Sequence, residues 1–164
     1  NRGDSAMIYR SAGDLDLKKI ITFINKLKKE EGLILNFLTD DGGELEKNRI
    51  INPRYFRALL FDFNSRVILV EENDKIFAIY VLYTPPKISI TTALELIHYY
   101  GEREVVAIDK GTLCSQFQEQ YSKVKLTLTQ EVDELGEKFG FENKETINYL
   151  SGNDYVYSLR LEGE

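Results

Sequence analysis

Residues 125–141 read KLTLTQEVDELGEKFGF, and this stretch determines how the last third of the chain is organised. The segment Val124–Thr129 alternates apolar and polar residues, which predicts a strand. A helix is expected over Glu131–Phe139. Gly140 would end it, because glycine can adopt the left-handed conformation common at helix ends. Two final strands are expected on either side of the turn SGND: Thr146–Leu150 and Tyr155–Leu161. The chain therefore ends as a strand, a helix and a two-stranded hairpin.

The front of the chain adds two helices and another hairpin. A strand is expected at Met7–Ser11, and a helix that Gly32 ends follows, with apolar residues at helical spacing: Leu17, Ile20, Ile21, Ile24 and Leu27. Asn52 and Pro53 form an N-cap and a first-turn proline, which predict a second helix through Phe63. From Arg66 the apolar residues no longer follow helical spacing but the two-residue period of a strand. Residues 67–70 and 76–82 are expected to form two largely buried strands of a hairpin, with the polar residues 71–75 at its tip. We expect one mixed α+β domain over residues 7–164, with residues 1–6 (NRGDSA) an added segment outside it.

Composition and charge exclude several classes of protein. The chain has 164 residues, 43% of them hydrophobic, and a net charge of −6, which argues against a nucleic-acid backbone binder. One cysteine and one histidine leave no intrachain disulfide and no zinc cluster to build, so we expect no metal site. No apolar run is long enough to cross a membrane, and no signal peptide opens the sequence. These features predict a cytoplasmic protein.

The phrase Glu137-Lys138-Phe139-Gly140-Phe141 ends the last helix, and a strand precedes it. In this phrase and in the order of its elements the chain resembles the GNAT superfamily of N-acetyltransferases. The layout agrees over about residues 7–161, and the sequence agrees over about 124–161. The resemblance implies a mixed, mostly antiparallel central sheet with helices on both faces. It also implies that the protein binds acetyl-coenzyme A between two central parallel strands and acetylates an amine of a small molecule or protein.

The family holds the cofactor pyrophosphate with the phrase Gln/Arg-x-x-Gly-x-Gly/Ala, which this sequence lacks. At the corresponding place, after a strand expected at Glu104–Asp109, a single glycine precedes hydroxyl-bearing residues. Backbone N–H groups at such a helix start bind anions, although a lone glycine is also simply a turn. The residues expected to contact acetyl-coenzyme A are Ile108, Gly111, Thr112, Leu113, Cys114 and Ser115. A second placement stays open, with Ile88–Ile90 as the cofactor strand and a helix over Thr91–Tyr100.

The catalytic positions of the family are not matched. Many members carry a tyrosine four residues before the glycine of the Gly-Phe pair, where it protonates the leaving thiolate. Here that position is Gly136, and the family's asparagine seven residues earlier is Thr129. Glycine has no proton to give, so the sequence indicates no catalytic residue. Two functions therefore stay open: a divergent acetyltransferase, or an inactive protein of the same fold that serves as a binding or structural component, such as a viral accessory protein.

Other candidate residues have a structural and a functional interpretation. Cys114 near a helix start is either a nucleophile or a small buried residue, and His98 is either a base or a packed side chain. Acidic residues in predicted loops are either a site for a basic amine or ordinary solvated charge: Asp40, Asp41, Glu44, Glu46, Glu71 and Glu72. Tyrosines late in the chain are either a protein-binding face or the rim of the core: Tyr80, Tyr83, Tyr99, Tyr100, Tyr149, Tyr155 and Tyr157. The sequence does not define an oligomeric state.

Overall fold

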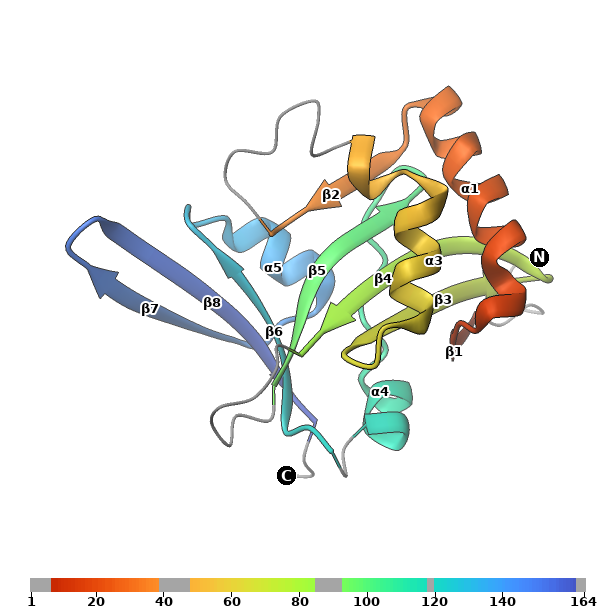
Figure 1. Ribbon diagram of the computed structural model, residues 1–164. Coiled ribbons are helices and arrows are strands. Elements are labelled where there is room, and N and C mark those ends of the chain that lie inside the picture. Colours follow the sequence, from red (N-terminus) through yellow and green to blue (C-terminus); the bar gives the residue numbers. More distant parts are fainter. Residues whose placement is uncertain (1–6, 39–47, 85–92, 118–119, 162–164) are drawn as a thin grey trace. The chain divides into compact units, whose positions relative to one another are not determined.

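The computed structural model describes residues 7–38, 48–84, 93–117 and 120–161. Within them lie eight strands in one mostly antiparallel sheet, of order β1-β3-β4-β5-β6-β8-β7, with β2 pairing to β5 (Figure 1). The α+β fold class expected from the sequence, with its mixed and mostly antiparallel sheet, is confirmed. By their internal contacts the residues form two compact units, which we call unit 1 (Asn1–Leu82 and Ile97–Glu104) and unit 2 (Tyr83–Leu96 and Val105–Glu164). Strand β5 passes through both.

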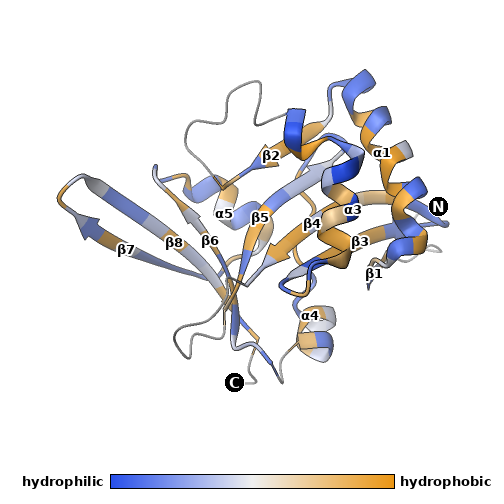
Figure 2. Cartoon of the chain, in the orientation of Figure 1, coloured by the Kyte–Doolittle hydropathy of each residue, from blue (hydrophilic) through white to orange (hydrophobic). Residues whose placement is uncertain are grey.

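Unit 1 contains two α-helices, a short 3-10 helix and the first four strands, except for the last residue of the fourth. Its elements are β1 (Ile8–Ser11), η2 (Asp14–Asp16), α1 (Leu17–Glu30), β2 (Leu33–Asn36), α3 (Pro53–Phe61), β3 (Ser65–Glu72) and β4 (Lys75–Tyr83, whose last residue belongs to unit 2). Figure 2 shows β3 and β4 as mostly hydrophobic strands, and their inner residues are buried. The turn between them is tight because Asn73 and Asp74 both take positive φ, as a two-residue hairpin requires. The predicted hairpin is confirmed.

Helix α1 buries one face and exposes the other. Ile20, Phe23, Ile24 and Leu27 are buried at helical spacing. The last helical residue is Glu30, and Glu31 caps the helix with a left-handed φ of 57°, a role that the sequence analysis gives to Gly32. Gly32 is needed for another reason: a Cβ there would stand 2.9 Å from the carbonyl oxygen of Gly101. Helix α3 begins as predicted, with the Asn52 side chain accepting a hydrogen bond from Arg54 N.

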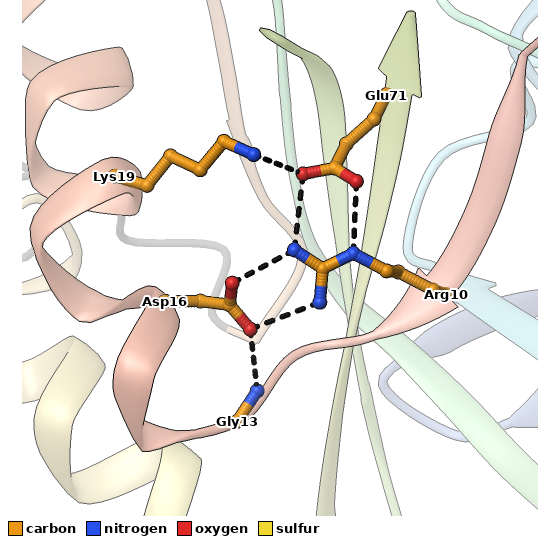
Figure 3. A network of polar contacts seen from close by, with 5 residues as sticks. All are labelled: Arg10, Gly13, Asp16, Lys19 and Glu71. Carbon is orange, nitrogen blue, oxygen red and sulfur yellow. Dashed lines mark hydrogen bonds and ion pairs between the residues drawn. The ribbon is translucent and has the colours of Figure 1, made fainter. Parts of the chain in front are cut away.

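An ion-pair network joins β1, the start of α1 and β3 (Figure 3). The guanidinium of Arg10 donates to both carboxylate oxygens of Glu71, at 2.8 and 3.0 Å, and to Asp16 at 2.7 Å. Lys19 donates to Glu71 at 2.6 Å, and Asp16 accepts from Gly13 N at 2.8 Å. Because the side chain of Glu71 is only 8% exposed, its charge depends on these two cations.

Unit 2 contains the parallel strand pair and the C-terminal hairpin. Its elements are the first residues of β5 (Ala93–Gly101), α4 (Lys110–Phe117), β6 (Lys123–Leu128), α5 (Asp133–Phe139), β7 (Asn143–Tyr149) and β8 (Gly152–Arg160). Ala93–Glu95 pair in parallel with Lys123–Lys125, and β8 pairs antiparallel with both β6 and β7. Gly140 closes α5 at φ 95°, as the sequence predicts. The rings of the buried Phe139 and of Phe141 are tilted to each other, with their centroids 6.0 Å apart.

Two predictions in this region are wrong. Residues 93–101 form a strand rather than part of a helix over Thr91–Tyr100, and their side chains are nearly all buried. Residues 104–109 form no strand, although Val105 and Val106 favour one; instead Ile108 N donates to the carbonyl of Phe139 at 2.9 Å. The elements on either side of residues 102–109 are therefore β5 and α4. The possible strand Ile88–Ile90 lies outside the described residues.

Candidate functional site

The candidate cofactor site is the start of α4. The first N–H groups of any helix lack an acceptor within the helix, and here they belong to Lys110, Gly111 and Thr112. The backbone is accessible at the exposed Gly111, where an added Cβ would meet, among the described residues, the Asp109 carboxylate at 3.6 Å. The ammonium of Lys110 lies 3.7 Å from Glu142, an exposed ion pair. Amide donors, an exposed glycine and a cation suit an anionic group.

Asp109 works against such an anion. Its carboxylate accepts a hydrogen bond from the Thr112 hydroxyl at 2.7 Å, and its backbone carbonyl accepts from Leu113 N at 3.1 Å. A carboxylate at this position stabilises the helix through its dipole but repels a second negative charge. A pyrophosphate at this helix start would therefore lie beside the Asp109 carboxylate or have to displace that side chain.

The six residues predicted to contact the cofactor lie close together, but they differ in which of their groups are accessible to a ligand. Ile108 and Leu113 are buried, and the Ile108 amide is already bonded to Phe139. The thiol of Cys114 donates to the carbonyl of Leu161 at 3.0 Å, and the hydroxyl of Ser115 donates to the carbonyl of Thr112 at 3.0 Å. The backbone at Gly111 and Thr112 is the part of the predicted set that is open to a ligand.

Position 136, where many members of the family carry a tyrosine, is a glycine here, and a side chain from strand β8 fills the space beside it. Gly136 is buried in α5, and a Cβ there would lie 2.5 Å from the ring of Tyr157 on β8. The hydroxyl of Tyr157 accepts a hydrogen bond from Val132 N at 2.9 Å and donates to Asp133 at 2.9 Å. Tyr157 was not predicted as part of this site; a helix-interior glycine ahead of a tyrosine-rich strand is the signal that points to it.

Charged groups surround that hydroxyl. The ammonium of Lys144 donates to Asp133 at 2.9 Å and also to Glu131. The hydrogen bond from Lys144, with that from Tyr157, lowers the pKa of Asp133, while burial and then the bond to Asp133 raise the pKa of Tyr157. Tyr157 and Lys144 line a small open pocket of about 220 Å³ with Glu137 and Phe141. With its pKa raised, the phenol of Tyr157 keeps its proton at neutral pH.

His98 is buried in β5 of unit 1, not in a helix. Its side chain is fully buried, and its Nε2 lies 2.6 Å from the hydroxyl of Tyr55. Burial, aided by the charge of Arg49 and opposed by the backbone of Ile97, lowers the pKa of His98 to about 3. A group with so low a pKa is neutral at physiological pH and is a weak base. His98 belongs to unit 1, where its Nε2 contacts the hydroxyl of Tyr55. Cys114 belongs to unit 2, where its thiol donates to the carbonyl of Leu161.

The acidic and tyrosine candidates differ in their surroundings. Glu71 belongs to the network of Figure 3, so it is not available to an amine; Asp40, Asp41, Glu44 and Glu46 lie outside the described residues. Four of the seven tyrosines, Tyr80, Tyr99, Tyr100 and Tyr157, are buried, and only Tyr149 is more than half exposed. Among the described residues no cluster of His, Cys, Asp and Glu forms a metal site, and no helix is long and apolar enough to span a membrane.

Comparison with solved structures identifies the fold. A probable acetyltransferase from Staphylococcus epidermidis is 10% identical, covers 94% of this chain and 99% of its own, and has a TM-score of 0.59. PaiA N-acetyltransferase from Thermoplasma acidophilum, solved with coenzyme A, is 13% identical over the same shares, with a TM-score of 0.58. AAC(6')-Ib, solved with ribostamycin and coenzyme A, is 9% identical over 94% and 93%, with a TM-score of 0.52.

The chain therefore has the fold of GNAT-family acetyltransferases over nearly its whole length. The resemblance stated from the sequence is thereby confirmed at the level of the fold. No protein-family model and no curated protein matches the sequence.

Proposed function

We propose that the protein is a GNAT-type N-acetyltransferase, which transfers the acetyl group of acetyl-coenzyme A to an amine. The observation that supports this most is the fold, shared over 94% of the chain with enzymes solved with coenzyme A. One of these was also solved with ribostamycin, an amine-bearing molecule. When bound, acetyl-coenzyme A would supply an acyl thioester; the chain's own residues would bind it and hold the amine.

The start of α4 supports the cofactor part of this proposal. The amides of Gly111 and Thr112 would donate to pyrophosphate oxygens, and the ammonium of Lys110 would add a positive charge. Thr112 can turn its hydroxyl from Asp109 to an oxygen of the ligand at little cost, because its side chain is close to solvent. We assign no catalytic residue, because Gly136 carries no proton and the phenol of Tyr157 already donates to Asp133.

A second function is favoured by two observations on unit 2. Tyr157 fills the space beside Gly136, and Asp109 places a negative charge where the pyrophosphate would bind. Both are expected of a chain that kept the scaffold and lost the chemistry. We therefore propose, as the alternative, an inactive GNAT-like protein that acts through a protein partner.

Acetyl transfer itself separates the two proposals. The purified protein is incubated with acetyl-coenzyme A and a panel of polyamines, aminoglycosides and lysine peptides. Release of free thiol is then followed, with mass spectrometry of each amine. Amine-dependent thiol release together with an acetylated amine supports the enzyme. Folded protein that yields neither with any amine supports the inactive alternative.

A further inference from the structure

Strand β7 is an unprotected edge of the sheet. It stands last in the strand order, and among the described residues only β8 pairs with it. All seven of its residues are exposed. A strand at an edge presents a row of backbone N–H and C=O groups that can pair with another strand, and proteins usually block such edges.

The usual means of blocking an edge are weak at β7. Lys144 is the strand's one cation, and its ammonium is held by Glu131 and Asp133 beside α5. Glu145 is then the one other charged side chain of β7 that could disfavour pairing with another strand. At the opposite end of the sheet, β1 has only four residues, and Arg10 anchors it in the network of Figure 3. The two edges therefore differ in length and in protection.

Apolar side chains gather at the β7–β8 hairpin. Ile147 is 36% exposed, Tyr149 is 55% exposed, and Leu150 at the turn is fully exposed. Ile147 and Tyr149 share one face of the strand with Glu145, because side chains alternate. Exposed apolar residues beside an open edge are typical of an interaction surface.

We propose that β7 pairs antiparallel with β7 of a second copy of this chain, with the two-fold axis at Ile147. In this register Ile147 lies opposite Ile147 of the partner subunit, and Glu145 lies opposite the partner's Tyr149. On the other face Thr146 lies opposite the partner's Asn148, and Lys144 opposite the partner's Leu150. The two sheets then continue into one another across the axis.

The strand is complementary to itself in this register. No two like charges stand opposite each other, which would destabilise the pair, and each exposed apolar side chain meets an apolar group or an alkyl stem. A second copy satisfies both conditions with the same residues on each side, as a two-fold interface requires. This interface is independent of the proposed acetyltransferase activity.

Cysteine cross-linking tests the register. The variants carry Cys114→Ser, which keeps a donor to Leu161, and either Ile147→Cys or Glu145→Cys. Directly opposite residues have Cα atoms about 4.5–5.5 Å apart, within the range of a disulfide. Two copies of position 145 would be about 14 Å apart, since four residues at roughly 3.4 Å each separate them. We expect Ile147→Cys to form a covalent dimer under mild oxidation. Glu145→Cys, on the same face, should form no covalent dimer.

The mass in solution is the second readout. By light scattering over a wide range of protein concentration, we expect the unaltered chain to form a dimer. Ile147→Lys, which would place two ammonium groups opposite each other, should be monomeric with an unchanged circular dichroism spectrum. Ile8→Lys is the matched control on the β1 edge and should stay dimeric. A monomer at every concentration, a dimer that Ile147→Lys does not affect, or equal cross-linking at positions 145 and 147 would overturn the proposal.

Discussion

The ring of Tyr157 occupies the space that any side chain at Gly136 would need. A Cβ on Gly136 would stand 2.5 Å from the ring carbon Cδ2, and the ring is held because its hydroxyl bonds both Val132 N and Asp133. The glycine in α5 is thus explained by packing: the helix and β8 approach so closely that only hydrogen fits between them. Because the ring of Tyr157 fills this space, the tyrosine that many members of the family carry at position 136 would not fit here.

Gly136→Ala should therefore destabilise the protein. Alanine is the better helix former by about 1 kcal/mol, but overpacking a core typically costs about 1–3 kcal/mol, and the anchored ring has little room to move. We expect a net loss of up to about 2 kcal/mol in the free energy of unfolding in urea. Gly111→Ala is the matched control, because it lies in α4 with open space around its Cβ; it should be neutral or stabilising. A stabilised Gly136→Ala would show that the contact is not tight.

His98 should make stability fall in acid. Its pKa is lowered to about 3 in the fold, so below its ordinary value of 6.5 the unfolded chain binds a proton that the folded chain refuses. One such group lowers the free energy of unfolding by about 1.4 kcal/mol per pH unit as the pH falls between these two values. In His98→Gln that contribution is absent, so its profile should be shallower by about this slope between about pH 6 and 4. Parallel profiles, from urea unfolding at each pH, would contradict the burial of a neutral His98.

Glu71→Gln should weaken the network of Figure 3. It leaves Arg10 and Lys19 without their shared, nearly buried carboxylate, and hydrogen bonds to charged groups contribute about 1.5–3 kcal/mol. The hydrogen bond from Arg10 lowers the pKa of Glu71 below 4.5, so the contribution is fully present above pH 4.5 and is lost as the pH falls through the lowered value. Unfolding in urea at neutral pH measures the loss.

The matched control for that prediction is an exposed ion pair. Glu142→Gln removes a carboxylate that is 58% exposed and 3.7 Å from Lys110, and such pairs contribute about 0–1 kcal/mol. Equal effects of Glu71→Gln and Glu142→Gln would mean that the burial of Glu71 contributes nothing.

Asp109→Asn should strengthen binding of coenzyme A. The amide keeps an acceptor for the Thr112 hydroxyl and removes the charge that opposes a phosphate at the start of α4. Charges at a helix end contribute about 0.3–1 kcal/mol, which corresponds to a dissociation constant lower by roughly two- to fivefold. Isothermal titration with coenzyme A measures it. An unchanged constant in a protein that binds the cofactor would place the pyrophosphate elsewhere.

Local sequence patterns were enough to predict the elements that are marked by a regular period, a cap residue or a glycine. The β3–β4 hairpin, the Asn52–Pro53 start of α3 and the Gly140 end of α5 follow directly from period, cap and glycine. Strand β5 did not, because it is a central strand buried on both faces, and a continuous apolar run has no period of two to separate it from a buried helix. Strand β2 has only four residues and depends on its pairing with β5.

The contacts around the candidate site could not be predicted from the sequence, because they join residues that are far apart in the chain. The position of α4 follows from the glycine and the hydroxyl-bearing residues near its start. The bond between Ile108 and Phe139, and the filling of Gly136 by Tyr157, join residues from separate elements. No local pattern encodes such contacts.

Thermal unfolding with and without millimolar acetyl-coenzyme A tests the central claim most directly. A ligand at about 100 times its dissociation constant stabilises a folded protein by roughly 2.7 kcal/mol. For a chain of this size the midpoint should rise by several degrees. We predict that rise for the unaltered protein and a larger one for Asp109→Asn. An unchanged midpoint in both, with circular dichroism showing folded protein, would contradict cofactor binding and favour the inactive alternative.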